Sequence, residues 1–143
     1  MGTTANFAAV SPRTGSVLMV AKDSITTNIN PTSTGNTFLL LTAGSSGSKV
    51  NEIVFQAGAT TEVGLGYVWI ATTGGAASTY FLYDVFVITA VTLSVSVPTA
   101  PYRLRKQYSD LLLPSGKSLY CSHAETNTTN QSIIDVTASG ADF

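Results

Sequence analysis

Residues 91–97 alternate without exception between apolar and hydroxyl side chains, in the order Val-Thr-Leu-Ser-Val-Ser-Val. A period of two places every apolar side chain on one face of an extended chain. The segment therefore predicts a β-strand with one buried and one solvated face. No window elsewhere shows a helical period, Thr is the most frequent residue, and the helix formers Glu and Lys are sparse. The sequence thus predicts an all-β chain.

Short apolar runs between glycine-rich turns continue this pattern along the chain. In residues 102–108, Tyr and Leu alternate with Arg and Gln, and Lys106 is the one residue that breaks the alternation. Residues 79–88 are apolar on both faces apart from Asp84, which predicts a central strand. The other predicted strands cover residues 37–42, 50–57, 66–72, 117–123 and 131–137. About eight strands, roughly 8–15 residues apart, predict a β-sandwich, and we expect the jelly-roll type.

The first 35 residues differ in composition from the rest of the chain. They are rich in Thr, Asn, Ser and Ala and contain one apolar run, Val17-Leu18-Met19-Val20. We interpret residues 1–35 as an extended N-terminal arm and residues 36–143 as the sandwich domain. The arm is expected to pair through this run with a neighbouring subunit. Two alternatives remain open, namely a disordered tail and an ordinary first strand formed by residues 16–21 of the same sandwich.

Composition limits the kinds of partner that the chain can bind. Only 10% of the residues are charged and the net charge is −1, whereas a nucleic-acid-binding protein needs a surplus of basic residues on one face. Ser and Thr together make up roughly a quarter of the chain, far above ordinary usage. A neutral surface rich in hydroxyl groups suits a protein that is buried against neighbouring subunits, or an extracellular protein. No apolar run reaches the length of a membrane helix, so neither nucleic acid nor a membrane is the expected partner.

Catalytic and cofactor-binding patterns are weak in this sequence. Cys121 and His123 are the only residues of their kinds, and on a strand their side chains share one face, which is compatible with a thiolate–imidazolium pair. We favour a structural role, because catalytic Cys/His pairs usually come from separate elements. The sequence has no C-x-x-C, H-x-x-x-H or EF-hand spacing, and Gly64-Leu65-Gly66 is a lone G-x-G that we interpret as a turn before a strand. The chain is predicted to need no cofactor or metal and to have no enzymatic activity.

Acidic and aromatic residues supply two further expectations. The acids are scattered singly, which gives no direct support for the paired carboxylates of a glycosidase. Asp84 stands in the most apolar strand and needs a partner if it is buried; we expect that partner to be Arg103 or Arg105.

Aromatic residues can fill a core or form an exposed surface that stacks on sugars, and we expect most of the following to lie in the core: Tyr67, Trp69, Tyr80, Phe81, Tyr83 and Phe86.

Taken along its length, residues 36–143 resemble the small virion proteins of tailed bacteriophages, in particular the jelly-roll head decoration (cement) proteins. The resemblance is one of overall character and not of a signature motif. It rests on the strand beginning in Gly47–Ile53, the alternating segment 91–97, the turn in Leu113–Leu119 and the C-terminal Gly140–Phe143.

This resemblance implies a structural protein that binds the outside of a capsid at subunit junctions. Its partners would be the major capsid protein and other copies of itself, as a homotrimer. It would be made in the host cytoplasm and would function on the capsid surface of the virion. Two other functions remain open: a receptor- or carbohydrate-binding module of a tail or fibre, and a sandwich-fold glycosidase, which the small size of the chain disfavours.

Overall fold

The protein is described by a computed structural model, which places residues 11–20, 23–24, 37–74, 79–125 and 132–143. Within these residues the chain forms nine strands: β1 (Ser11–Val20), β2 (Asp23–Ser24), β3 (Phe38–Thr42), β4 (Ser48–Ala57), β5 (Gly64–Thr72), β6 (Phe81–Ile88), β7 (Arg103–Leu113), β8 (Lys117–Glu125) and β9 (Ile133–Asp142). The all-β class predicted from the sequence is confirmed.

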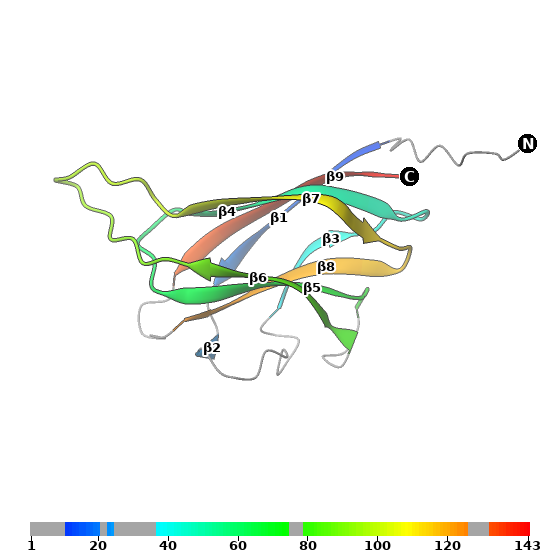
Figure 1. Cartoon of the computed structure of the whole chain (residues 1–143), viewed down its shortest axis with the longest axis horizontal. Coiled ribbons are helices and arrows are strands. Elements are labelled where there is room, and N and C mark those ends of the chain that lie inside the picture. The colour runs from blue at the N-terminus through cyan, green and yellow to red at the C-terminus, as the bar shows by residue number, and fades with distance from the viewer. Residues whose placement is uncertain (1–10, 21–22, 25–36, 75–78, 126–131) are drawn as a thin grey trace, which may run out of the picture.

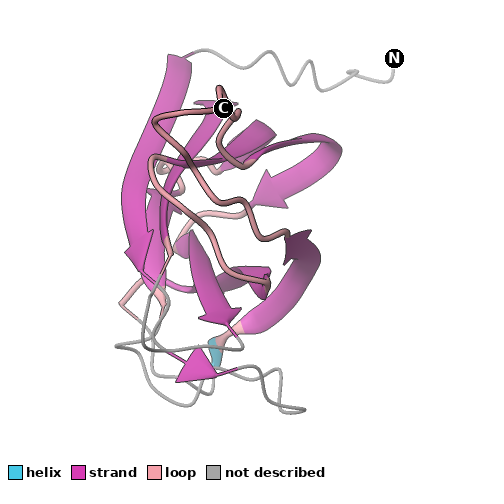
Figure 2. Cartoon of the chain, turned by 90° about the vertical axis from the view of Figure 1, so that its left-hand side faces the viewer, coloured by secondary structure: helices cyan, strands magenta, loops and turns pink. Residues whose placement is uncertain are grey.

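The strands form two sheets that face each other, as Figures 1 and 2 show. The first sheet has the order β1-β9-β4-β7, and the second has the order β2-β8-β5-β6, with β3 also paired to β8. All pairings are antiparallel except that of the two-residue β2 with β8. This arrangement is a β-sandwich, in which each sheet buries one face against the other.

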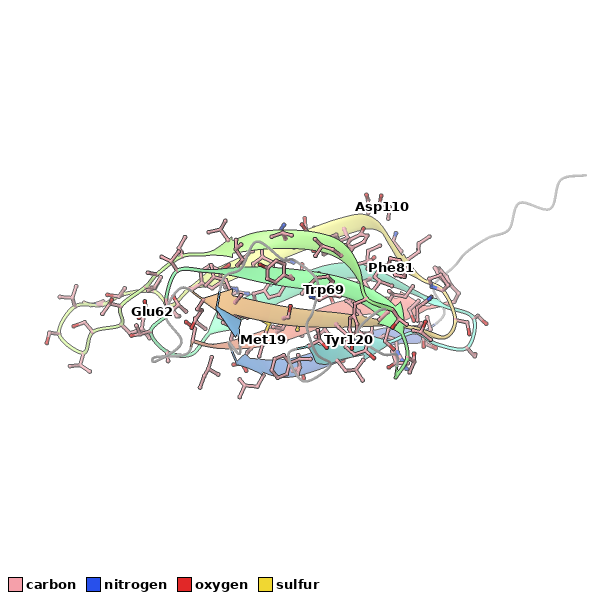
Figure 3. The ribbon with its side chains drawn as sticks, turned by 90° about the horizontal axis from the view of Figure 1, so that it is seen from below. Met19, Glu62, Trp69, Phe81, Asp110 and Tyr120 are labelled. Carbon is pink, nitrogen blue, oxygen red and sulfur yellow. The ribbon has the colours of Figure 1, made fainter. Side chains whose placement is uncertain are left out.

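The main core lies between the two sheets. Alternate residues of β4, among them Ile53 and Phe55, are fully buried there, as strand geometry requires for a sheet with one buried face. A second, smaller cluster lies on the outer face of the second sheet, which is the lower sheet in Figure 1; there Tyr67 and Trp69 of β5 pack with Tyr120 of β8. Figure 3 views this face from below and shows Trp69 and Tyr120 on it. Both faces of β5 and β8 therefore carry buried side chains.

The two lateral sides of the sandwich are held together in different ways. On one side the backbone of β1 lies directly against β3, and Arg13 of β1 donates a hydrogen bond from Nη2 to the Thr42 carbonyl of β3 at 2.5 Å. On the other side β6 and β7, the last strands of their sheets, are joined by side chains, including a hydrogen bond of 2.9 Å from Lys106 of β7 to Asp84 of β6. Tyr102, just before β7, adds a hydrogen bond of 3.0 Å from its hydroxyl to the Val87 carbonyl. The free edges of β6 and β7 therefore lie on the same side of the molecule.

The apolar run Val17–Val20 lies in β1, a strand of the first sheet. Val17 is paired with Val136 of β9, and Met19 is fully buried in the main core. This placement is that of the alternative interpretation, an ordinary first strand, so the boundary at residue 35 does not separate β1 from the sandwich. Residues 1–10, 21–22 and 25–36 of the expected arm lie outside the described residues. Pairing of the run with a neighbouring subunit stays a prediction.

The alternating segment 91–97 does not form the strand that its pattern predicts. It belongs to the loop between β6 and β7, and the one ladder contact that it makes with the described residues is an isolated bridge between Val91 and Thr61. The reason is topological: the loop crosses from one sheet to the other, and no strand edge of the described chain accompanies it. Val95 is fully exposed and Val97 is 61% exposed. Within the described structure, the alternating pattern therefore does not correspond to a strand with one buried face.

The part of the chain that the structure describes contains no apolar helix of membrane-spanning length.

Candidate interaction surface

Cys121 and His123 lie on β8 with their side chains directed into the sandwich. Cys121 is fully buried and its thiol approaches the Phe38 carbonyl at 3.8 Å; burial raises the pKa of this thiol to about 12. Burial also lowers the pKa of His123 to about 4. A protonated thiol and a neutral imidazole that are both withdrawn from solvent lack the accessible thiolate that nucleophilic catalysis needs.

His123 faces Glu125 and not the thiol. Its Nε2 lies 3.3 Å from Oε1 of Glu125, and both side chains are fully buried. The carboxylate also accepts a bifurcated hydrogen bond from the backbone N–H of Ser132, 3.1 Å from each oxygen. The same spacing of two residues that places Cys121 beside His123 on one strand face also places Glu125 there, so sequence reasoning could have found this pair. Because no solvent reaches it, we interpret the pair as part of the core.

We expect the double variant Cys121→Ser, His123→Gln to fold and to keep its partner binding. Both changes conserve side-chain size approximately, so the free energy of unfolding should fall by at most a few kcal/mol. Urea denaturation followed by a binding assay checks this. A variant that still unfolds cooperatively but no longer binds its partner would contradict the structural role.

Asp84 has a partner from β7, but it is not the one predicted. Its Oδ2 accepts hydrogen bonds of 2.9 Å from Nζ of Lys106 and from the hydroxyl of Tyr108. Arg105 instead forms an ion pair with Glu52 of the neighbouring β4. The expectation of an arginine was wrong because Lys106, which breaks the alternation of its strand, is directed to the inner face where Asp84 lies.

These contacts set the ionisation of the Asp84–Tyr108 pair. Partial burial alone would raise the pKa of Asp84, but the hydrogen bonds from Lys106 and Tyr108 and the lysine charge outweigh burial and lower this pKa. Burial, followed by the bond to the Asp84 carboxylate, raises the pKa of Tyr108. The carboxylate is therefore ionised and the phenol protonated at neutral pH, and together with Lys106 they connect the edges of β6 and β7.

Replacing Asp84 with Ala is expected to lower the free energy of unfolding by about 1–3 kcal/mol at pH 7, because it leaves Lys106 and Tyr108 without their shared acceptor. A lowered folded-state pKa gives stability that is present above the ordinary carboxyl range and is lost as the pH falls through the lowered value. The difference between variant and wild type should therefore shrink in acid. Urea denaturation at pH 7 and pH 3 tests this, with Asp110→Ala, an exposed acid, as the control. Equal losses in the two variants would contradict it.

Two other acids are paired with basic groups rather than with a second carboxylate. Asp142 lies 3.4 Å from Nε of Arg13 and accepts a hydrogen bond from Ser48, and Glu52 is paired with Arg105. Among the described residues, no group of three or more His, Cys, Asp and Glu side chains is placed to hold a metal ion.

The aromatic residues divide between the core and the surface. Tyr67, Trp69, Tyr80 and Phe86 are buried, as expected for most of the set. The Trp69 indole donates a hydrogen bond of 2.7 Å to Ser122 Oγ, and Phe86 packs in the main core with its ring centroid 4.0 Å from that of Phe55. Phe81 and Tyr83 of β6 are instead exposed.

β6 carries four exposed apolar residues, which lie on both faces of this edge strand: Phe81 pairs with Ile70, which packs on the main core, whereas Val85 and Val87 pair with residues of the outer cluster. The β6 patch consists of Phe81, Tyr83, Val85 and Val87, which are 67%, 38%, 39% and 60% exposed. A bulge between Val68 and Trp69 of β5 shifts the register of the β5–β6 pair. Val85 and Val87 pair with outward-facing residues of β5. The Tyr83 ring instead contacts the ring of Tyr108 on β7. The prediction of a central strand for residues 79–88 was wrong, because β6 is the last strand of its sheet. Because β6 is at an edge, the apolar residues on its two faces indicate exposed surface and not a strand that is buried on both faces.

A second exposed apolar feature lies next to this patch in sequence. The loop of residues 89–101 projects beyond the ends of the sheets, at the left of Figure 1, and it contains no charged residue. Its exposed Val95 and Val97 are the most prominent apolar side chains there. We call these two residues the loop tip. The β6 patch and the loop tip are the candidate interaction surface.

The chain has no match among protein-family models, curated proteins or solved structures. Its function is therefore inferred from the fold and from these two surfaces.

Proposed function

We propose that this chain is a head decoration (cement) protein of a tailed bacteriophage. In this function it binds the outside of the capsid at junctions between copies of the major capsid protein and stabilises the shell. It is made in the host cytoplasm, functions on the capsid surface, and needs no enzymatic activity, cofactor, nucleic acid or membrane.

The observation that carries this proposal is the exposure of uncharged apolar side chains on β6 and on the loop of residues 89–101. Exposed apolar residues gathered in one region are typical of protein-binding sites, and an uncharged site costs little to desolvate. The β6 patch and the loop tip have both properties. By contrast, His123 and Glu125 have fully buried side chains.

The proposal includes the jelly-roll type of sandwich. The sheet orders support it: β1-β9-β4-β7 and β3-β8-β5-β6 place the first strand beside the last, and among the described strands only β5 and β6 are neighbours both in a sheet and in sequence. Such an order arises when an antiparallel ribbon is wrapped into two sheets, as in the capsid and lectin domains built on jelly rolls.

The proposal also includes a homotrimer and an N-terminal contact with a neighbouring subunit. Low charge favours subunit association, because neutral faces are cheap to desolvate. The run Val17–Val20 is in an edge strand of its sheet, and an edge strand can add to a sheet of another chain.

Capsid shells prepared without this chain provide the test. We expect the purified protein to bind such shells to saturation and to slow their disruption by heat, because it bridges neighbouring subunits. Sedimentation measures the binding and electron microscopy the intact shells. Shells that already carry the chain are the matched control, since their sites are occupied and should bind no more. Failure to bind shells that lack it would contradict the proposal.

A second function is favoured by one observation, the exposure of Phe81 and Tyr83 on β6. Exposed aromatic rings can stack on sugar rings, as a receptor- or carbohydrate-binding module of a tail or fibre requires. Saturable binding to a glycan array that is lost in Phe81→Ala would support this function over the first.

A further inference from the structure

The end of β8 is fastened to two neighbouring segments through the Glu125 carboxylate. Both of its oxygens accept the N–H of Ser132, at 3.1 Å each, and Ser132 directly precedes β9. The Ser132 hydroxyl in turn accepts the N–H of Glu62, in the connection between β4 and β5, at 2.8 Å. Glu125 and Ser132 are 0% and 1% exposed. We call this series of hydrogen bonds, from Glu125 through Ser132 to Glu62, the β8–β9 latch.

His123 lies beside the latch without a hydrogen bond of its own. Its Nε2 is 3.3 Å from Oε1 of Glu125, yet neither ring nitrogen has a hydrogen-bond partner among the described residues. The ring lies against the glycines of β5: His123 pairs with Gly66, and a Cβ atom added at Gly64 would be 3.0 Å from Nε2. Buried polar groups are normally hydrogen-bonded, because leaving one unpaired costs free energy. The ring therefore has unused hydrogen-bonding capacity directly beside the latch.

Within the described part of the chain, Glu125 is the one acid in ion-pair contact with His123. The other titratable residue on this face of β8 is Cys121, whose thiol stays protonated because burial raises its pKa to about 12. β5 presents glycines to the ring, and Glu62, just before β5, contributes its backbone N–H to the latch. Asp23 of β2 is paired with Ala124, which faces the outer cluster and not the core.

The other elements around this end of the core present apolar side chains or charges that are paired elsewhere. Met19 of β1 and Ile134 of β9, which pair with each other near Ser132, are apolar and fully buried. The inward-facing Lys106 of β7 is bound to Asp84 of β6. Arg13 lies near Asp142, at the opposite end of β1 and β9. A charge on His123 would therefore be balanced by Glu125.

A proton on His123 changes which group Glu125 binds. A neutral imidazole has one N–H, whereas the imidazolium has two and carries a positive charge. Oε1 of Glu125, 3.3 Å from Nε2, is the acceptor that the imidazolium can reach, but this oxygen is bound to the Ser132 N–H. A hydrogen bond between an imidazolium and a carboxylate is shorter, at about 2.7–2.9 Å, and stronger than one to a neutral donor. The carboxylate must therefore move toward the ring and away from Ser132.

We infer that the β8–β9 latch is released by acid: a proton on His123 draws the Glu125 carboxylate away from Ser132 and loosens this end of the sandwich. No covalent bond changes, and the proton comes from solvent and returns to it when the pH rises. Burial lowers the pKa of His123 to about 4, so at pH 7 the ring is neutral and the latch is closed. The inference concerns the chain alone and does not depend on capsid decoration.

Hydrogen exchange of the full chain, followed by NMR at pH 7 and pH 4, tests the release. The protection factor of the Ser132 N–H, which is corrected for the pH dependence of the chemical exchange step, should fall at least about tenfold at pH 4. The N–H of Val136, in the middle of β9, should keep its protection. In His123→Gln, whose side chain takes up no proton, Ser132 should stay protected at both pH values. Asp110→Ala removes an exposed acid and is the matched control, which should respond as wild type does.

The unfolding equilibrium supplies a second measurement. Because the folded-state pKa of His123 is lowered, the resulting stability is present above the ordinary value of 6.5 and is lost as the pH falls toward about 4. The unfolding constant of wild type, divided by that of His123→Gln, should therefore rise about 100-fold from pH 7 to pH 4. Urea denaturation of both chains at these pH values measures the ratio, from which the carboxyl groups common to both chains cancel.

Three results would overturn the inference. If Ser132 loses its protection at pH 4 in His123→Gln as well, acid acts without His123. If that variant does not fold, wild type still decides, because the NMR titration of the His123 ring and the loss of Ser132 protection must have the same midpoint; different midpoints would contradict the release. A His123 ring that titrates near pH 6.5 while Ser132 stays protected throughout would also be incompatible with it.

Discussion

A Gly66→Val variant is expected to lose about 3 kcal/mol of stability or more. Gly66 lies on the inner face of β5, and a Cβ atom added there would stand closer than van der Waals contact to three carbons of the Phe86 ring. That ring cannot withdraw easily, because it is 5% exposed and packs against Phe55 in the main core. Inserting side-chain atoms into a filled core forces strained rotamers or backbone shifts, and such a loss is a large part of the total stability of a small domain.

The matched control is Gly58→Val. Apart from its chain neighbours, no atom of the described residues lies within 4 Å of a Cβ added at Gly58, so the same change of residue should alter the free energy of unfolding by no more than about 0.5 kcal/mol. Urea denaturation of both variants, compared through their midpoints at equal slope, measures the difference. Equal midpoints for the two variants would show that the inner face of β5 is not packed as described.

Replacing Trp69 with Ala is expected to cost about 3–5 kcal/mol. The indole is 2% exposed and lies in the cluster on the outer face of the lower sheet, where its ring centroid is 5.7 Å from that of Tyr67. Its loss leaves a cavity and also removes the hydrogen bond to Ser122. A cost of this size would show that the cluster on the outer face stabilises the fold as strongly as the core between the sheets does.

The control for Trp69 is Leu112→Ala, an apolar residue of β7 that is 53% exposed. Its truncation removes little buried area and should change the midpoint of urea denaturation slightly. A loss below about 1 kcal/mol in Trp69→Ala, with Leu112→Ala unchanged, would contradict the burial of Trp69.

Much of the fold could be predicted because strands and turns leave local signals. The predicted strand at 50–57 corresponds to β4 (Ser48–Ala57), and that at 117–123 corresponds to β8 (Lys117–Glu125). At Gly64-Leu65-Gly66 the prediction was wrong, because these residues are the start of β5 and not a turn. The close packing of Phe86 on Gly66 explains the glycine there, and no local pattern reports a contact with a residue so distant in sequence.

The two largest errors concern long-range placement. Segment 91–97 has the alternation of a strand, but alternation shows only that one face is apolar and not that a sheet is present to receive it. Segment 79–88 is apolar on both faces, which is typical of a central strand, yet β6 is at an edge. Both errors mark the same region, and both have the same physical cause: apolar side chains that the described chain does not bury. These residues make up the candidate interaction surface, which sequence reasoning did not identify.

The partner of Asp84 is the residue at which the sequence pattern of its strand is irregular. Lys106 broke the alternation of residues 102–108, and the structure places it against Asp84. The lysine that interrupts the regular pattern of this strand therefore makes the contact with Asp84, whereas Arg105, which fits the pattern, pairs with Glu52.

The number of copies of this chain in purified virions tests the central claim most directly. Quantitative mass spectrometry of intact particles would give its ratio to the major capsid protein. A decoration protein that occupies junctions over the whole shell should be present in many copies, in a fixed ratio to the capsid subunit and in multiples of three. A few copies per particle that remain with isolated tails, or the absence of the chain from purified virions, would contradict the proposed function.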